Sequence, residues 1–238
     1  PCVAFVNKMD KPGADFTLAV QSMGARLGVR VVVLELPVFV DGLLSGVVNL
    51  FTREAWRTQD ESSERLPLEL PPELVDEIEI MRIDLIDALI SLDETLFEQA
   101  CEGIEPSLVE MKRALRNCVI EKSLLPVLCG AAVNGVGIES VLDAVVDYLP
   151  SPMDIPLVVT QGSESGGSEL PCDPAGPLAA LCFKRHYGAK IDQSFLRLYS
   201  GKLEAGSVVQ NSRTGKSERV LSMMRIHGDG GEQVEQAV

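Results

Sequence analysis

The first 150 residues alternate between short apolar runs and stretches in which apolar residues have helical spacing. The apolar runs cover residues 2–6, 31–34 and 124–129, and their length predicts strands buried in a parallel sheet. Apolar residues recur every three or four positions at Phe16, Val20, Met23 and Leu27, at Leu74, Ile78, Met81, Leu85, Leu89, Leu92 and Leu96, at Leu108, Met111, Leu115 and Val119, and at Ile138, Val141, Leu142, Val145, Val146 and Leu149. This spacing predicts four amphipathic helices, and the second should run from Pro72 through Leu96.

A hairpin pattern interrupts this alternation. Residues 36–40 and 46–50 are strand-like and flank an Asp41-Gly42 turn, whereas residues 57–72 are polar and proline-rich and predict a loop. We therefore expect residues 1–150 to form an α/β domain, a partial P-loop-type sheet, with an inserted hairpin-and-helix subdomain over about residues 36–122.

The apolar period changes to two after residue 177. Strands predicted at 178–183, 194–199, 207–210 and 218–226, separated by glycine-containing turns, indicate a partial antiparallel β-barrel over residues 177–238. Residues 151–176 are expected to be a linker, because they are rich in Gly, Ser and Pro from residue 160 onward.

Composition narrows the class of protein. Apolar residues make up 46% of the chain, enough for a sizeable core, and the net charge of −14 argues against DNA as a partner. No apolar run approaches the roughly 20 residues of a membrane span. Six cysteines without a CxxC pair fit reduced thiols and a cytoplasmic location.

The acidic residues are concentrated. Residues 60–110 hold sixteen Asp or Glu against two Arg, whereas residues 177–238 hold nine Lys or Arg against six acids. A solvated helix face that keeps the protein soluble explains the acidic cluster, and so does a docking face for a basic partner.

The segment Asn7-Lys8-Met9-Asp10 follows the first predicted strand, where open α/β sheets place ligand-binding residues. A carboxylate at Asp10 can accept hydrogen bonds from the N1–H and the exocyclic amine of guanine, two donors that adenine lacks. Asn7 can bridge the base and a neighbouring loop, and the Lys8 stem can lie against the ring. The segment Gly215-Lys216-Ser217 is not a phosphate loop, because Gln210 stands where that motif needs glycine.

Three segments together resemble the elongation factor G family of translational GTPases. They are Ala4–Asp10, Cys129-Gly130-Ala131-Ala132, and Leu142–Pro152 with its Leu-Pro-Ser-Pro end. In the predicted barrel, Phe195–Gly201, Gly206 and Asn211 resemble domain II of the same family.

The resemblance implies a fragment that joins the carboxyl-terminal part of a GTPase domain to part of domain II. It implies GTP or GDP as the ligand, bound through Asn7, Lys8, Asp10, Gly130, Ala131 and Ala132, with Mg²⁺ in the full-length protein and none expected here. The ribosome would be the partner, with the stalk protein on the acidic 73–120 helices and the small subunit on the barrel. The parent would hydrolyse GTP to drive translocation.

Two departures from the family pattern matter. Ala131 stands where the family usually has Ser, and the base contact is expected from the backbone N–H of Ala132. The family's phosphate loop and switch segments belong before Pro1, so we expect no catalytic residue here, no GTP hydrolysis and only weak GTP binding. A ribosome-recycling or ribosomal protection relative, or a non-hydrolysing ribosome-docking protein, would fit the same segments.

Overall fold

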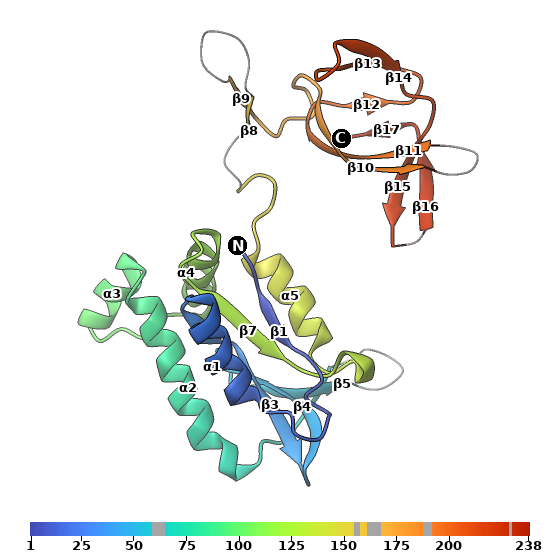
Figure 1. Ribbon diagram of the computed structural model, residues 1–238. Helices are drawn as coiled ribbons and strands as arrows, with labels where there is room; N and C mark the ends of the chain where they lie inside the picture. The colour runs from blue at the N-terminus through green and yellow to red at the C-terminus, as the bar shows by residue number, and fades with distance from the viewer. Residues whose placement is uncertain (59–64, 155–157, 161–167, 188–191, 229) are drawn as a thin grey trace. The chain divides into compact units, whose positions relative to one another are not determined.

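The computed structural model describes residues 1–58, 65–154, 158–160, 168–187, 192–228 and 230–238. The chain divides into two compact units, residues 1–150 and 151–238, and each is described by itself (Figure 1). No helix among the described residues is long and apolar enough to cross a membrane.

A three-stranded parallel sheet is the centre of the first unit. Its order is β1 (Ala4–Val6), β7 (Leu125–Cys129) and β2 (Val31–Val33), so the last strand of this sheet lies between the first two. Figure 1 shows β1 and β7 side by side. Every residue of β7 is buried, as expected for a central strand. The three predicted parallel strands are confirmed.

Helix α1 (Phe16–Leu27) connects β1 to β2 and has clear signals at both ends. The Asp15 side chain accepts a hydrogen bond from the backbone N–H of Leu18 at 2.8 Å, and Gly28 ends the helix with a φ of 64°. A left-handed residue at this position favours glycine, so the helix ends directly after Leu27, the last residue of the predicted apolar spacing.

A four-stranded antiparallel sheet follows β2. It comprises β3 (Glu35–Val40), β4 (Leu43–Asn49), β5 (Ala55–Thr58) and β6 (Arg65–Pro67), paired in that order. The backbone N–H of Leu34 donates to the carbonyl of Val127 at 2.9 Å, which brings the start of β3 to the parallel sheet. The loop predicted over residues 57–72 is therefore wrong where β5 and β6 occupy part of that range. Residues 59–64 of the predicted loop lie outside the described part of the chain.

Three helices follow: α2 (Pro72–Ile90), α3 (Glu94–Cys101) and α4 (Leu108–Ile120). The prediction of a single helix from Pro72 through Leu96 is wrong, because the helix is interrupted at residues 91–93. Asp93 begins α3 by accepting a hydrogen bond from the backbone N–H of Leu96 at 3.0 Å. Leu96 is fully buried, so the apolar spacing continues across a break that it does not reveal.

The second unit consists of antiparallel strand pairs. They are β8 (Val158–Thr160) with β9 (Ser168–Leu170), β10 (Ala179–Tyr187) with β11 (Asp192–Ser200), β12 (Leu203–Glu204) with β17 (Gln236–Ala237), β13 (Val208–Asn211) with β14 (Lys216–Arg219), and β15 (Met223–His227) with β16 (Gly230–Val234). The antiparallel class is confirmed, but the described strands do not close into a barrel.

Two details of the second unit correct the predictions. The predicted linker contains the β8–β9 pair, and the strand predicted over 218–226 is interrupted at residues 220–222, between β14 and β15. The linker residues 161–167 lie outside the residues that the structure describes.

Candidate functional site

The loop after β1 and the loop after β7 meet through one side chain. The Oδ1 atom of Asn7 accepts hydrogen bonds from the backbone N–H of Lys8 at 2.7 Å and from that of Ala132 at 3.0 Å. Lys8 has a φ of 65°, a left-handed conformation that a lysine adopts at some cost. The turn at Lys8 and the Asn7 side chain therefore form one local arrangement that reaches the second loop.

Backbone hydrogen bonds join the same two loops. The N–H of Met9 donates to the carbonyl of Gly130 at 3.0 Å, and the N–H of Gly130 donates to the carbonyl of Val6 at 3.1 Å. Met9 is 3% exposed and belongs to the hydrophobic core below the loops. The loops are therefore held at the carboxyl ends of neighbouring parallel strands, the expected place for a ligand site.

Glycine is required in the second loop for space. A Cβ atom added to Gly130 would lie 2.1 Å from the carbonyl oxygen of Val136, and one added to Gly137 would lie 2.2 Å from the carbonyl oxygen of Cys129. Gly137 also has a φ of 79° and directly precedes α5 (Ile138–Tyr148). The loop folds back on β7 more closely than any other residue type permits.

Asp10 supplies the charge of this region. Its side chain is 16% exposed, and its Oδ2 atom lies 2.7 Å from Nζ of Lys11. The hydrogen bond from Lys11 lowers the pKa of the Asp10 carboxyl, so this group is ionised at neutral pH. It can accept hydrogen bonds from a ligand if the carboxylate contacts Lys11 and the ligand at the same time.

The remaining predicted residues differ in accessibility. Ala131 is 1% exposed and its N–H donates to the carbonyl of Val136 at 3.0 Å, whereas Ala132 and Lys8 are exposed. The N–H of Ala132, which the sequence assigns to the base, donates here to Asn7. The structure thus brings Asn7, Gly130 and Ala132 together, and Asp10 stands one turn away beside Lys11.

Sequence reasoning missed two supports of this site. The first is Met9, which stands between Lys8 and Asp10 in the sequence. Its buried side chain holds the turn against the core. The second is the Gly135-Val136-Gly137 segment, where two positive-φ glycines shape the return to β7. That spacing was a visible turn signal in the sequence.

The groups that the two loops present are hydrogen-bond donors and acceptors. The Asp10 carboxylate can accept, whereas the Asn7 oxygen and the backbone N–H of Ala132 are hydrogen-bonded to each other and would have to be shared with a ligand. This set suits recognition of a planar polar ligand through hydrogen bonds. Among the described residues, no group of three or more His, Cys, Asp or Glu side chains could hold a metal ion.

Proteins that are similar to this chain in sequence are elongation factors. The elongation factor G of Fervidobacterium nodosum is 39% identical over 239 residues, which are 99% of this chain and 34% of the relative. The elongation factor G of Thermotoga neapolitana is 39% identical over 243 residues, with the same coverage. The chain spans about a third of the length of the relatives it matches.

A solved structure shows the same fold. The crystal structure of a protein from Thermus thermophilus superposes with a TM-score of 0.79 at 25% identity, over 100% of this chain and 33% of that one. Residues 1–151 match the family described as the elongation factor Tu GTP-binding domain. The chain therefore belongs to the elongation factor Tu GTP-binding domain family, and it is similar over 99% of its length to elongation factor G.

Proposed function

We propose that the loops after β1 and β7 select guanine for a ribosome-dependent translational GTPase. The hydrogen bond between Asn7 Oδ1 and the N–H of Ala132 carries the proposal, because it joins the two loops that a base must touch together. In this proposal Asp10 accepts from guanine N1–H and the exocyclic amine, and the stem of Lys8 covers one face of the ring. The Ala132 N–H is shared between Asn7 and the base oxygen.

For the full-length protein we propose the activity that the relatives' names suggest. GTP hydrolysis with Mg²⁺ would drive translocation during protein synthesis in the cytoplasm, with phosphate positioning and the metal supplying most of the rate. Residues 1–150 would contribute the base-binding part of the GTPase domain, with the insertion over about residues 36–122, and residues 177–238 would belong to domain II. Residues 1–238 alone are expected not to hydrolyse GTP.

Base selectivity can be tested without the phosphate-binding part. In ¹⁵N-resolved NMR spectra, guanosine should shift the backbone amides of residues 7–10 and 130–132, and adenosine should not. Two or three charge-assisted hydrogen bonds offset only part of the association cost, so we expect a Kd above about 1 mM. Equal shifts with both nucleosides contradict guanine selection, and micromolar affinity contradicts the predicted weakness.

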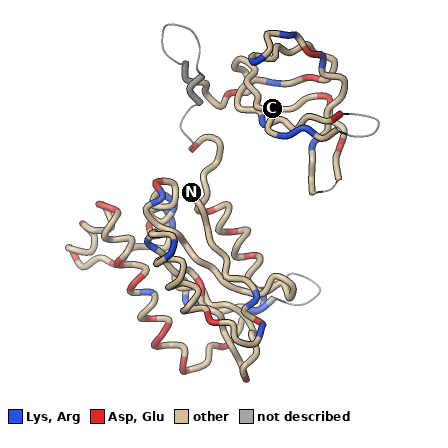
Figure 2. The backbone as a smooth tube through the Cα atoms, viewed as in Figure 1, with Lys and Arg blue, Asp and Glu red and all other residues tan. Residues whose placement is uncertain are grey.

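A second proposal concerns the acidic helices. Glu73, Asp76, Glu77, Asp84 and Asp87 are exposed on α2, and Figure 2 shows the acidic residues following α2 and α3. Ile80 and Ile83, 60% and 54% exposed, lie among them on the solvent side of the helix. An apolar pair ringed by acids suits a partner with an apolar centre and a basic rim, and we assign this face to the ribosomal stalk protein.

The stalk proposal predicts a graded response to substitution. In a pull-down with the carboxyl-terminal domain of the stalk protein, Ile80→Ser should weaken capture, and Asp84→Lys should weaken it most at low salt. The control variant is Asp41→Lys, in the exposed turn between β3 and β4, which changes the charge by the same amount as Asp84→Lys. Capture that is unchanged by Ile80→Ser and Asp84→Lys contradicts this assignment and leaves guanine selection untouched.

The second unit is assigned to the small ribosomal subunit. Its predicted barrel residues carry a net positive charge, and Lys184, Arg185 and Arg197 lie over aromatic rings at 5.4, 5.1 and 5.9 Å. Basic side chains beside aromatic rings suit ribosomal RNA. Binding of residues 1–238 to small subunits should weaken as salt rises, and salt-independent binding would contradict an RNA contact.

A further inference from the structure

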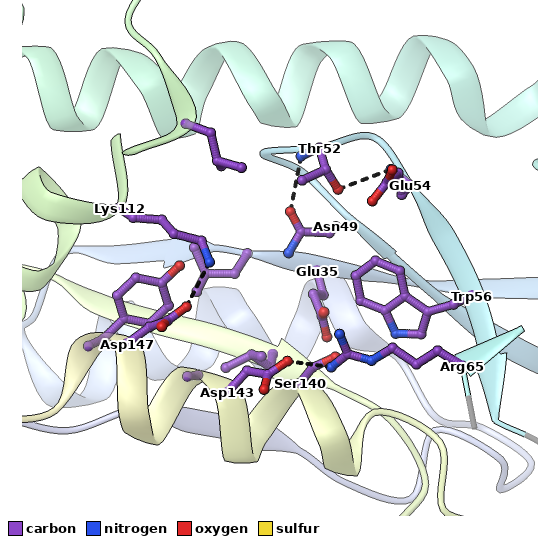
Figure 3. A pocket seen from close by; sticks show the side chains of 15 residues that line it. Glu35, Asn49, Thr52, Glu54, Trp56, Arg65, Lys112, Ser140, Asp143 and Asp147 are labelled. Atoms are coloured by element: carbon purple, nitrogen blue, oxygen red, sulfur yellow. Dashed lines mark hydrogen bonds and ion pairs between the residues drawn. The ribbon is translucent and has the colours of Figure 1, made fainter. Parts of the chain in front are cut away.

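Three acidic residues of α5 lie along one side of the helix and meet basic side chains from other elements of the first unit. Glu139, Asp143 and Asp147 are four positions apart, a spacing that places them on one helical face. Glu139 and Asp143 contact Arg65 of β6. Asp147 contacts Lys112 of α4, and Figure 3 shows this pair together with the pair of Arg65 and Asp143. Ion pairs therefore hold α5 near both of its ends.

Arg65 makes the most extensive of these contacts. Its Nε atom lies 2.9 Å from Oε2 of Glu139, and its Nη2 atom lies 2.6 Å from Oδ2 of Asp143. Its guanidinium also lies 4.8 Å from the centre of the Trp56 ring of β5 (Figure 3). A planar guanidinium that contacts two carboxylates and a ring is fixed in position more tightly than a single surface pair. Arg65 therefore links the β5–β6 edge of the antiparallel sheet to the first two turns of α5.

The end of α5 that Arg65 holds is next to the second base-binding loop. Glu139 is the second residue of the helix, which begins directly after Gly137. Gly137 is packed against β7, because a Cβ atom added to it would lie 2.2 Å from the carbonyl oxygen of Cys129. No space is left there for the helix to shift alone, so a movement of its first turn must be passed to the loop.

Backbone hydrogen bonds continue from this turn into the loop. The N–H of Val141 donates to the carbonyl of Gly137 at 3.2 Å, and the N–H of Ala131 donates to the carbonyl of Val136 at 3.0 Å. The next residue, Ala132, is the one whose N–H reaches the first base-binding loop. The position of Ala132 therefore depends on where α5 begins.

We propose that Arg65 is a positioning residue for guanine recognition. By holding Glu139 and Asp143 it fixes the first turns of α5 and, through Gly137, the loop that presents the Ala132 N–H. This proposal rests on guanine selection by the two loops, and Arg65 acts through α5 rather than on the base.

The first test needs no ligand. Arg65→Met keeps an unbranched apolar stem and removes the guanidinium, so amide hydrogen exchange at Ala131 and Ala132 should become about 2- to 5-fold faster, the range for partly exposed ion pairs. Exchange at Leu128, in the central strand β7, reports the stability of the whole unit, and the change in the loop should exceed any change there. Equal acceleration at Leu128 and in the loop would mean general destabilisation and would overturn the proposal.

Arg53→Met is the matched control. The Arg53 guanidinium makes two hydrogen bonds to the Glu79 carboxylate, which tie the turn between β4 and β5 to α2 rather than to α5. Its removal costs the same kind of contact, and exchange at Ala131 and Ala132 should not change. Equal loop acceleration in Arg53→Met and Arg65→Met would contradict a specific role for Arg65.

Two further variants test whether Arg65 acts through its carboxylate partners. Arg65→Lys keeps the charge but not the guanidinium geometry, so it should restore part of the loop protection. Glu139→Gln should accelerate loop exchange by itself and add little to Arg65→Met, because the contact is already lost in that variant. Fully additive effects of Glu139→Gln and Arg65→Met would overturn the proposed route.

Guanosine binding completes the experiment. In NMR titrations of residues 1–238, Arg65→Met should raise the guanosine Kd about 2- to 5-fold, and Arg53→Met should not. Faster loop exchange with an unchanged guanosine Kd would overturn the positioning role alone. Equal shifts with guanosine and adenosine in the parent protein would instead contradict guanine selection, whatever the effect of Arg65→Met on exchange.

Discussion

Asn7 and Ala132 are 125 residues apart in the sequence and are joined by a 3.0 Å hydrogen bond from the Ala132 N–H to the Asn7 side chain. The same Oδ1 atom also accepts from Lys8, so one side chain fixes a turn in the first loop and the start of the second. Two loops tied in this way present a preformed surface, and a ligand that touches both meets little ordering cost.

Asn7→Ala should free the Ala132 amide. Loss of one neutral hydrogen bond is worth about 0.5–1.5 kcal/mol, so amide hydrogen exchange at Ala132 should become roughly 3- to 10-fold faster. Asn134→Ala, an exposed asparagine of the same loop, is the control and should leave this exchange rate unchanged. Unchanged exchange in Asn7→Ala would show that other contacts hold the two loops together.

Asp10→Asn should change the base that the site prefers from guanine to xanthine. The carboxylate matches the two donors of guanine, whereas an amide presents one donor that suits the C2 carbonyl of xanthine. The guanosine-induced amide shifts should weaken at least about 10-fold, and xanthosine should produce shifts at the same amides. The control is Asp41→Asn in the β3–β4 turn, where a φ of 52° suits asparagine. Retained guanosine selectivity in Asp10→Asn would remove Asp10 from the site.

Gly130→Ala should destabilise the protein, although alanine is usually harmless at negative φ. The added Cβ would lie 2.1 Å from the Val136 carbonyl oxygen and 3.1 Å from the Phe5 ring, so the backbone must move. We expect a loss of about 1–3 kcal/mol or more in the free energy of unfolding.

Gly24→Ala is the matched control for that substitution. Gly24 lies inside α1, and a Cβ there would find its nearest atoms at 3.8 Å. It should stabilise the protein by about 0.5–1 kcal/mol, because alanine favours helix more than glycine does. Chemical denaturation measures both variants, and equal effects would mean that the close approach at Gly130 relaxes freely.

The pattern of apolar residues predicted most of the first unit, because parallel strands and amphipathic helices bury their residues at regular spacing. It failed at residues 91–93, where Asp93 caps a new helix while Leu96 keeps its place in the core. It failed again at β6, whose short edge segment Arg65–Pro67 has too few residues to show a period. Capping and edge pairing depend on local hydrogen bonds that spacing does not encode.

The candidate site was predictable in its residue types and only partly in its geometry. The Asn-Lys-x-Asp segment identified the loop, but no sequence pattern shows that the Ala132 N–H donates to Asn7. Glu35 was overlooked as well, although a glutamate between Leu34 and Leu36 in an apolar strand is an unusual choice. A charged residue within such a run indicates a buried polar site rather than a break in the strand.

The buried Glu35 carboxyl makes stability depend on pH in an unusual direction. Its pKa is about 7 in the folded protein and near the ordinary 4.5 in the unfolded chain. Between these values the folded state holds a proton that the unfolded state has lost, so the free energy of unfolding should fall as pH rises from 4.5 to 7 and then level off. The loss from this one group is on the order of 3 kcal/mol.

Glu35→Gln should abolish that slope, because the amide stays neutral at every pH. Urea denaturation of both proteins between about pH 4.5 and 8 measures the difference. The variant should gain on the parent protein as pH rises, with the two curves separating most between about pH 5 and 7. Parallel curves would show that Glu35 is ionised in the folded state throughout, so that its neighbours stabilise the charge more strongly than burial opposes it.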